Sequence, residues 1–318
     1  MGVKLLVIVD RFRWALHRQF LGFKPHLPDD WSAVAVDAVT VAREDLVAAD
    51  IIYLSSWNMP HWYPRLGPLL APHVERTIAG LHSHYSLEED KRRDTRPERD
   101  ASPCPRAVAE LARFKSVGAV SPRLRRLLQA DLPRVHWLQA GVDPDLFLCT
   151  HPVNPQRPKL RVGWAGSLVN QPGNRGFDEI LFPLQQILAD RFEFHYCVEH
   201  VNGREFSDMC AFYNSIDVYL CASRSEGAST PVREALACGR PVISSKVGDA
   251  PEIVVPDRNG WILPAWSLDA AATVLLGVHE DRQRLLQATA CARPSILAGW
   301  QWNQVAWRWV EAFLDVLA

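Results

Sequence analysis

The apolar residues of this chain fall into short runs that are separated by helical patterns. Residues 3–9 form one such run. All of them are apolar except Lys4, and the run is too short for a helix. Such runs are the pattern of parallel strands that are buried on both faces. Further candidate strands lie at 34–39, 51–54, 76–80, 116–120, 135–138, 160–164, 192–198, 216–220, 241–244 and 260–263. The alternation of strands and helices predicts an α/β protein with open parallel sheets.

The segment 144–158 divides these elements into two groups. It contains four prolines and has no hydrophobic periodicity, which indicates a linker. A chain of 318 residues is long enough for two domains, each with its own core. We therefore expect a Rossmann-like, doubly wound domain at 1–150 and a second one at 151–300. Helical patterns lie between Trp14 and Phe23 and at about 62–71, 104–114, 122–130, 176–189, 205–214, 231–238, 249–255, 267–281 and 301–317.

Residues 226–243 predict a loop, a helix and a strand in close succession. They begin Glu-Gly-Ala-Ser-Thr-Pro-Val-Arg-Glu, so two glutamates stand eight residues apart. Pro231 suits the first turn of a helix, and Gly239 suits its left-handed end. The start of such a helix presents free N–H groups, which bind anions and phosphate above all.

Glu226 and Glu234 have several interpretations. Eight helical residues span roughly 12 Å, whereas the carboxylates of a retaining glycosidase stand about 5 Å apart. A second interpretation gives each glutamate a separate task on one ligand, since carboxylates accept hydrogen bonds from sugar hydroxyls. A third is that both are solvated glutamates on a surface helix.

The surrounding residues resemble the donor-binding half of retaining glycosyltransferases of the GT4 type, which have the GT-B fold. The Glu-x7-Glu spacing of Glu226 and Glu234 is the signature of that family. The resemblance is carried by Cys-Ala-Ser-Arg-Ser-Glu-Gly at 221–227, Glu-Ala-Leu-Ala-Cys-Gly-Arg-Pro-Val-Ile at 234–243, Val-Gly-Asp-Ala-Pro-Glu-Ile-Val at 247–254 and Asp-Arg-Asn-Gly-Trp-Ile-Leu-Pro at 257–264. It implies two Rossmann-like domains that face a cleft, with the acceptor on the N-terminal side. The helix at 301–318 is expected to cross back to the N-terminal domain.

The resemblance also implies roles for individual residues. Glu234 is expected to hold the ribose of a nucleoside-diphosphate sugar, and Glu226 to orient the hydroxyls of the transferred sugar. Ser229 and Thr230, next to Gly227, are expected to hold the phosphates at the helix start. The acceptor is a small molecule, a glycan or a lipid-linked molecule that the sequence does not identify.

The positive charges that face the diphosphate differ from the family pattern. Ser167 stands where the family has an arginine after the first strand of the C-terminal domain, and Arg175 stands where it has a lysine. Arginine can bind phosphate through two hydrogen bonds, so the second change preserves the chemistry. Arg224 is a candidate to replace the first charge.

His82 follows the strand expected at 76–80, where the family often has a histidine that faces the transferred sugar. Its alternative is an ordinary surface or core histidine. His84 forms a His-x-His pair with it, but no third ligand stands at metal-binding spacing. The sequence therefore favours a reaction without a metal cofactor.

Composition excludes some functions and leaves others open. The net charge of −1 gives no broad basis for binding nucleic acid. The seven cysteines include no Cys-x-x-Cys pair, and the first residues form neither a signal peptide nor a membrane span, so we expect a cytoplasmic protein. Trp302 and Trp309 recur at helical spacing and predict core packing. A nucleotide-sugar epimerase, a phosphorylase and a non-catalytic nucleotide-sugar binder remain as alternatives to a glycosyltransferase.

Overall fold

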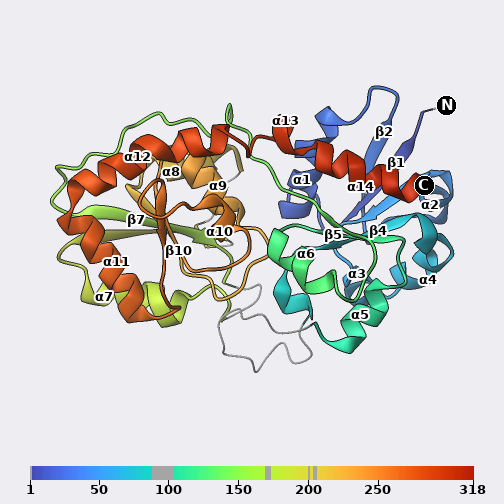
Figure 1. Ribbon diagram of the computed structural model, residues 1–318, viewed down its shortest axis with the longest axis horizontal. Helices are drawn as coiled ribbons and strands as arrows, with labels where there is room; N and C mark the ends of the chain where they lie inside the picture. The colour runs from blue at the N-terminus through green and yellow to red at the C-terminus, as the bar shows by residue number, and fades with distance from the viewer. Residues whose placement is uncertain (1, 88–102, 169–172, 200, 203–205) are drawn as a thin grey trace. The chain divides into compact units, whose positions relative to one another are not determined.

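The computed structural model describes residues 2–87, 103–168, 173–199, 201–202 and 206–318, which form two compact units. Among these residues, the first unit contains the chain up to Gly141 together with Trp302–Ala318, and the second contains Val142–Gln301. Each unit has a parallel β-sheet with helices packed around it (Figure 1). The predicted fold class, two Rossmann-like domains with parallel sheets, is confirmed.

The first unit has a six-stranded sheet in the order β2-β1-β3-β4-β5-β6. Its strands are β1 (Lys4–Val9), β2 (Ser32–Asp37), β3 (Ile51–Leu54), β4 (Thr77–Leu81), β5 (Ser116–Ala119) and β6 (Val135–Trp137). Its α-helices are α1 (Ala15–Phe23), α2 (Arg43–Ala48), α3 (Met59–Trp62), α4 (Leu66–Leu70), α5 (Pro105–Leu111), α6 (Pro122–Leu128), α13 (Trp302–Val305) and α14 (Trp307–Leu317). Short 3-10 turns lie at η1 (Lys24–His26), η2 (Ala71–Arg76) and η3 (His84–Leu87).

The second unit has a five-stranded sheet in the order β11-β10-β9-β7-β8. Its strands are β7 (Leu160–Gly166), β8 (Phe192–Val198), β9 (Val218–Cys221), β10 (Val242–Ser244) and β11 (Gly260–Ile262). Its α-helices are α7 (Phe182–Ile187), α8 (Met209–Asn214), α9 (Thr230–Ala237), α10 (Ala250–Ile253), α11 (Leu268–Glu280) and α12 (Arg282–Leu297). A π-helical turn, η4 (Phe177–Leu181), precedes α7, and a 3-10 turn, η5 (Phe206–Asp208), precedes α8.

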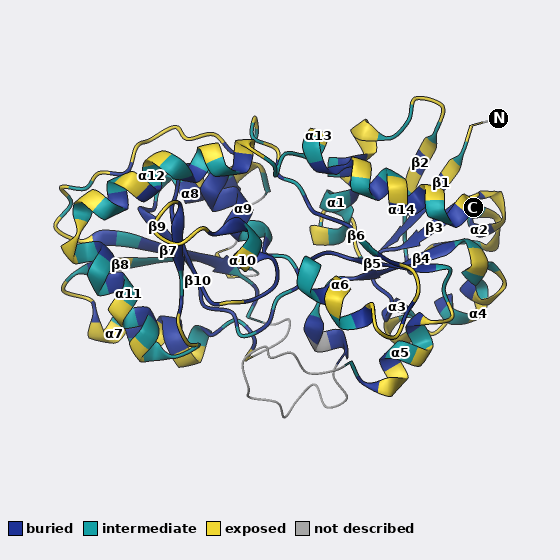
Figure 2. Ribbon diagram, viewed as in Figure 1, coloured by how far each residue is buried: buried dark blue, intermediate teal, exposed yellow. Residues whose placement is uncertain are grey.

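The C-terminal helix α14 completes the core of the first unit. Trp309 is fully buried, stacks on Phe23 with ring centroids 4.6 Å apart, and donates from its indole nitrogen to the carbonyl oxygen of Gln139 at 2.8 Å. Trp302 packs against the same core. The predicted return of the last helix to the N-terminal domain and the predicted core role of both tryptophans are therefore confirmed. In both units the central strands are largely buried and the outer helix faces are exposed (Figure 2).

Helix α9 has the limits that its sequence predicts, within one residue. Pro231 lies in its first turn, and Gly239 follows it with a φ of +72°, in the left-handed region that favours glycine. Every residue from Val232 to Ala237 is buried. A helix buried on all sides is held rigidly by its neighbours, so it can fix the side chains that it carries.

Helix α12 is the largest element that the sequence pattern did not predict. The side chain of Asp281 caps its start by accepting from the backbone N–H of Arg284 at 2.9 Å. Pro294 within the segment and the polar residues near its start conceal the helix. A signal is nevertheless present in the helical spacing of its fully buried residues, which are Leu285, Ala288, Ala292 and Ile296. The helix packs against α9 and supports it from behind.

Candidate functional site in the second unit

The strand order of the second sheet indicates where a ligand would bind. The chain runs from β7 to its neighbour β8, and then continues with β9 on the other side of β7. Ligands of open α/β sheets bind outside the carboxyl ends of the strands, at the point where the strand order reverses. Ser167 follows β7 directly, and residues 222–229 follow β9. These two segments border that position.

Arg175 and Glu226 lie here and form an ion pair, in which an Arg175 guanidinium nitrogen donates to Oε1 of Glu226. The hydroxyl of Ser223 donates to the same oxygen at 2.7 Å. The negative charge of Glu226 is the main cause that raises the pKa of Arg175, so the guanidinium stays charged. The Nε of Arg175 is buried and has no hydrogen-bond partner within the described part of the chain. This N–H group is therefore a donor that the described residues leave unsatisfied.

The loop before η4 carries Arg175 and is fixed to the loop after β9. The backbone N–H of Arg224 donates to the carbonyl oxygen of Asn174 at 2.8 Å, and the Arg224 guanidinium donates to the Asn174 side chain at 2.9 Å. Gly176 has a φ of +65°, and a Cβ there would stand 2.1 Å from the carbonyl oxygen of Ala222. The two loops thus approach each other so closely that this position requires glycine.

The start of α9 is held by a buried ion pair. Arg233 donates to Asp249, and both side chains are 1% exposed. Asp249 also accepts from the backbone N–H of Ser229 at 2.8 Å, and Arg233 donates to the hydroxyl of Thr230 at 3.3 Å. One N–H group at the predicted phosphate-binding helix start is therefore bonded to a carboxylate of the protein itself.

Gly227 lies against the loop that follows β10. Gly248 of that loop has a φ of +54°, and a Cβ on it would stand 2.9 Å from the carbonyl oxygen of Gly227 and 3.0 Å from the Cβ of Glu226. Ser167, at the end of β7, is buried. Gly227, Ser167, Arg224 and Arg175 therefore all lie at the carboxyl ends of the strands.

Glu234 lies in the second turn of α9 and is 3% exposed. Its Oε2 accepts a hydrogen bond from the hydroxyl of Tyr213 at 2.6 Å. Tyr213 is fully buried in α8. Only a small part of the Glu234 carboxylate is thus open to a ligand, and its orientation is set by the protein interior.

His82 lies in the first unit, directly after β4. His82 is partly buried, and its Nε2 is 3.1 Å from the hydroxyl of Tyr53, which is fully buried. Burial lowers the pKa of His82 to about 4, although a hydrogen bond with the backbone of Ser55 opposes this. The imidazole is therefore neutral at physiological pH.

Sequence reasoning missed the side chains that support this site. Ser223 contacts Glu226, Asn174 contacts Arg224, Tyr213 contacts Glu234, and Asp249 contacts Ser229. Asp249 and Ser223 lie within segments that carry the family resemblance, so their positions were marked. The pairings themselves were not predicted, because, apart from the contact of Ser223 with Glu226, they join residues that are at least 20 positions apart in the sequence.

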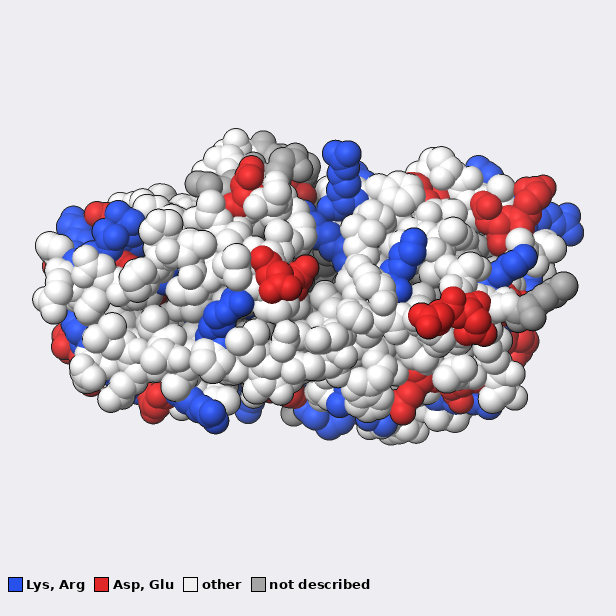
Figure 3. All heavy atoms as spheres, turned by 90° about the horizontal axis from the view of Figure 1, so that it is seen from above, with Lys and Arg blue, Asp and Glu red and all other residues white. Residues whose placement is uncertain are grey.

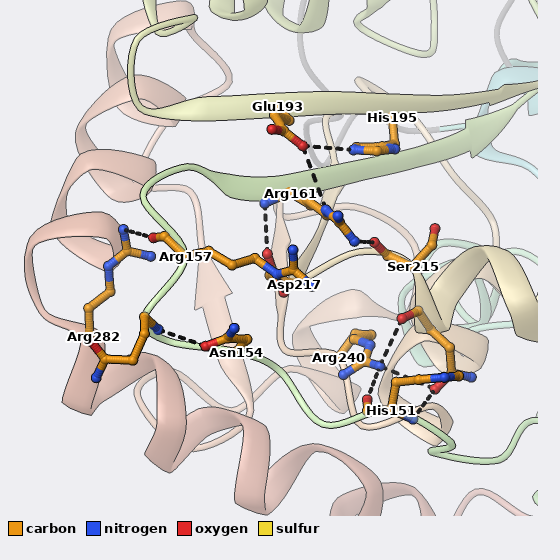
Figure 4. A network of polar contacts seen from close by, with 12 residues as sticks. His151, Asn154, Arg157, Arg161, Glu193, His195, Ser215, Asp217, Arg240 and Arg282 are labelled. Atoms are coloured by element: carbon orange, nitrogen blue, oxygen red, sulfur yellow. Dashed lines mark hydrogen bonds and ion pairs between the residues drawn. The ribbon is translucent and has the colours of Figure 1, made fainter.

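The amino ends of the same strands carry a different polar cluster (Figure 4). Asp217 accepts from the backbone N–H of Arg161 at 2.9 Å, and its Oδ1 is 3.7 Å from Nε of Arg157. Arg240 donates to the carbonyl oxygen of Tyr213 at 2.9 Å. These contacts connect the linker at 144–158 to the amino ends of the strands, whereas Glu226 lies at their carboxyl ends.

Three broader properties concern the described residues. They include no group of three or more His, Cys, Asp or Glu side chains placed to hold a metal ion. None of their helices combines the length and the apolar character needed to cross a membrane. On the face shown in Figure 3, acidic and basic side chains are interspersed and form no extended basic region.

Comparison with known sequences finds a family match that includes most residues of this site. Residues 176–281 match the family model of glycosyl transferases group 1. The amylovoran biosynthesis glycosyltransferase AmsK of Erwinia amylovora is 25% identical over 150 residues, which are 45% of this chain and 36% of AmsK. A GDP-mannose-dependent monoacylated alpha-(1-6)-phosphatidylinositol monomannoside mannosyltransferase of Corynebacterium glutamicum is 29% identical over 216 residues, 57% of this chain and 56% of that protein. The chain thus spans about a third to just over half of the length of these curated relatives.

Comparison with solved structures covers nearly the whole chain. HepE of Anabaena, in complex with UDP and glucose, has a TM-score of 0.71 at 14% identity and covers 98% of this chain and 99% of its own. Sucrose-phosphate synthase of Thermosynechococcus elongatus has a TM-score of 0.69 at 15% identity and covers 99% of both chains. The resemblance predicted from residues 221–264 is thereby confirmed: this chain has the GT-B fold, and its residues 176–281 match the model of group 1 glycosyl transferases.

Proposed function

We propose that the chain is a retaining glycosyltransferase that moves a sugar from a UDP- or GDP-linked donor to an acceptor hydroxyl without a metal ion. The observation that carries this proposal is Arg175, a partly buried guanidinium at the carboxyl ends of β7 and β9. It pairs with Glu226 and has an Nε–H without a hydrogen-bond partner in the described structure. A charged donor in this position suits a phosphate oxygen.

The donor would lie across the loops that follow β7, β9 and β10. Its diphosphate would face Arg175 and the start of α9, with Ser229 and Thr230 beside it, while Gly227 allows close approach. Glu234 would accept hydrogen bonds from the ribose hydroxyls. Arg224 would add positive charge near Ser167. These roles are consistent with the names of several relatives and neighbours, which include GDP-mannose-dependent enzymes and a complex with UDP-glucose.

The sugar would be oriented by Glu226 and the reaction driven by electrostatics. Ser223 and Arg175 fix the Glu226 carboxylate, so it can accept from sugar hydroxyls without reorganising. When the bond between the sugar and the diphosphate breaks, negative charge grows on the leaving phosphate, and Arg175 would stabilise it. The acceptor oxygen would form its bond on the same face of the sugar, and its proton would pass to the leaving phosphate oxygen. His82, which is neutral, would accept or donate a hydrogen bond rather than supply charge.

We also propose a cell compartment for the enzyme, from the state of its cysteines. All seven cysteines are free, and Cys197, Cys221 and Cys238 are buried thiols. Free, buried thiols suit a reducing compartment, so we place the enzyme in the cytoplasm.

Release of nucleotide from UDP-glucose and GDP-mannose tests this function even without the acceptor, because water can replace the acceptor slowly. The released sugar is observed by proton NMR before its anomers equilibrate. A retaining enzyme releases the α anomer first from either donor. First release of the β anomer would contradict retention, and the absence of both nucleotide binding and release would contradict the function.

A further inference from the structure

The hydrogen bond between Tyr213 and Glu234 joins two helices of the second unit. Tyr213 is in α8 and Glu234 in α9, and the donor and acceptor oxygens are 2.6 Å apart. This length is in the range of an O–H group that donates to a charged carboxylate. Burial, together with the charge of Glu234, raises the pKa of Tyr213 well above its ordinary value. The hydroxyl therefore keeps its proton and acts as a donor.

The Tyr213 ring has little freedom to move. It contacts Phe147, Phe212 and Tyr219, with ring centroids 6.0 Å, 5.4 Å and 5.9 Å away. Its own carbonyl oxygen accepts from Arg240 at 2.9 Å. The backbone and the ring are thus fixed from separate directions, so the hydroxyl is presented to Glu234 at a fixed position.

A second tyrosine provides an internal comparison. Tyr219 is buried in the same core, but its hydroxyl lies 3.3 Å from the carbonyl oxygen and 3.4 Å from the nitrogen of Ala165. Both tyrosines therefore place a buried hydroxyl against a polar partner. Only the hydroxyl of Tyr213 contacts a side chain of the candidate site.

We propose that Tyr213 is a positioning residue, which holds the Glu234 carboxylate in the orientation that accepts hydrogen bonds from the ribose of the donor nucleotide. This inference rests on the proposed function and names a residue that acts on the ligand through another. Because Glu234 is 3% exposed, a small rotation of its carboxylate would turn its acceptor groups away from any ligand.

The test compares binding of a ribonucleotide with that of an analogue that lacks the ribose hydroxyls. UDP and GDP are titrated by calorimetry, and the one that binds is compared with its 2′,3′-dideoxy form. The quantity measured is the ratio of the two dissociation constants, for the wild type, for Tyr213→Phe and for the matched control Tyr219→Phe. We expect the wild type to prefer the ribonucleotide by about tenfold or more, which corresponds to one or two hydrogen bonds.

Tyr213→Phe should reduce this preference by about fivefold, mainly because the variant binds the ribonucleotide more weakly. Tyr219→Phe should leave the preference unchanged, although both variants lose a buried hydrogen bond and should melt at lower temperature. An unchanged preference in Tyr213→Phe, or an equal loss of affinity for both nucleotides, would show a merely structural role and overturn the inference.

The same experiment separates failure of this inference from failure of the proposed function. A wild type that binds neither UDP nor GDP overturns both. A wild type that binds without preferring ribose overturns the role of Tyr213 and leaves nucleotide binding standing. If Tyr213→Phe does not fold, 3-fluorotyrosine is placed at position 213 and, as control, at 219. The substitution alters donor strength but keeps the hydroxyl, so the preference should change at 213 alone; no change at either position overturns the inference.

Discussion

Glu226 and Glu234 share one sequence motif but have different surroundings. Glu226 is bonded to Arg175 and Ser223, and its side chain is 14% exposed, whereas Glu234 is nearly buried against Tyr213. An accessible carboxylate that balances a cation suits contact with a substrate group that changes during reaction. A buried carboxylate with a fixed partner suits recognition of a group that does not change.

This contrast predicts different effects of the two alanine variants. Glu234→Ala should weaken the binding of nucleotide and of nucleotide sugar equally, by about 1–3 kcal/mol. The contacts that it removes are equally strong before and during the reaction. Glu226→Ala should leave nucleotide affinity unchanged or slightly tighter, because Arg175 loses its internal partner, while turnover falls sharply. Calorimetry and donor-release rates measure both, with melting temperature as the control for folding. The reverse pattern, or normal turnover in both variants, would refute the assignment.

The neutral His82 predicts a pH dependence of stability. Its pKa is lowered to about 4 in the folded protein, whereas an unfolded histidine titrates near 6.5. Between these values the unfolded state binds a proton that the folded state does not, so the free energy of unfolding falls as the pH falls through this window.

His82→Gln should therefore lose less stability than the wild type between pH 7 and pH 5, by about 1–2 kcal/mol. Chemical denaturation at the two pH values measures the difference, and His195→Gln, at a partly exposed surface position, is the control. An identical loss in the wild type and in His82→Gln would contradict a lowered pKa of His82 in the folded protein.

At the scale of elements, α9 is fixed at its start by the pair of Arg233 and Asp249, and along its length by α8 and α12. Removing one member of a buried ion pair leaves the other charge buried without a partner. Arg233→Met should therefore cost about 3–5 kcal/mol of folding stability, and the double variant with Asp249→Asn should cost less than the sum of the single changes.

The control is an exposed pair of the same residue types. Arg284 and Asp257 are 39% and 61% exposed, so Arg284→Met should cost less than about 1 kcal/mol. Chemical denaturation of the four variants measures these values. Equal costs for Arg233→Met and Arg284→Met would mean that the buried pair does not hold the start of α9.

Most strands and the limits of α9 could be predicted from the sequence. Parallel strands buried on both faces are continuous apolar runs, so they were located within about two residues, and the glycine and proline around α9 fixed its limits. The sequence also marked Arg175 and Glu226 as site residues. It did not predict their ion pair, since they are 51 residues apart and side-chain contacts between loops leave no periodic signal. Tyr213 was missed for the same reason, and α12 because Pro294 interrupts its pattern.

At the scale of the whole molecule, the account predicts activity that does not depend on a metal ion. Arg175 would supply the charge that a metal supplies in other transferases. Excess EDTA should leave the rate of nucleotide release from the donor unchanged. Loss of release in EDTA that manganese or magnesium restores would overturn this part of the proposal.

We expect a nucleoside diphosphate to bind at the carboxyl ends of the strands of the second sheet, at Arg175. Calorimetric titration of UDP and GDP into the wild type, Arg175→Gln and Arg157→Gln tests it most directly. Both arginines are partly buried and face a carboxylate, but Arg157 lies at the amino ends of the strands. The account predicts that one nucleotide binds the wild type, that Arg175→Gln weakens it about tenfold or more, and that Arg157→Gln changes it less than about twofold. Absence of binding by either nucleotide at millimolar concentration, or equal effects of the two substitutions, would contradict it.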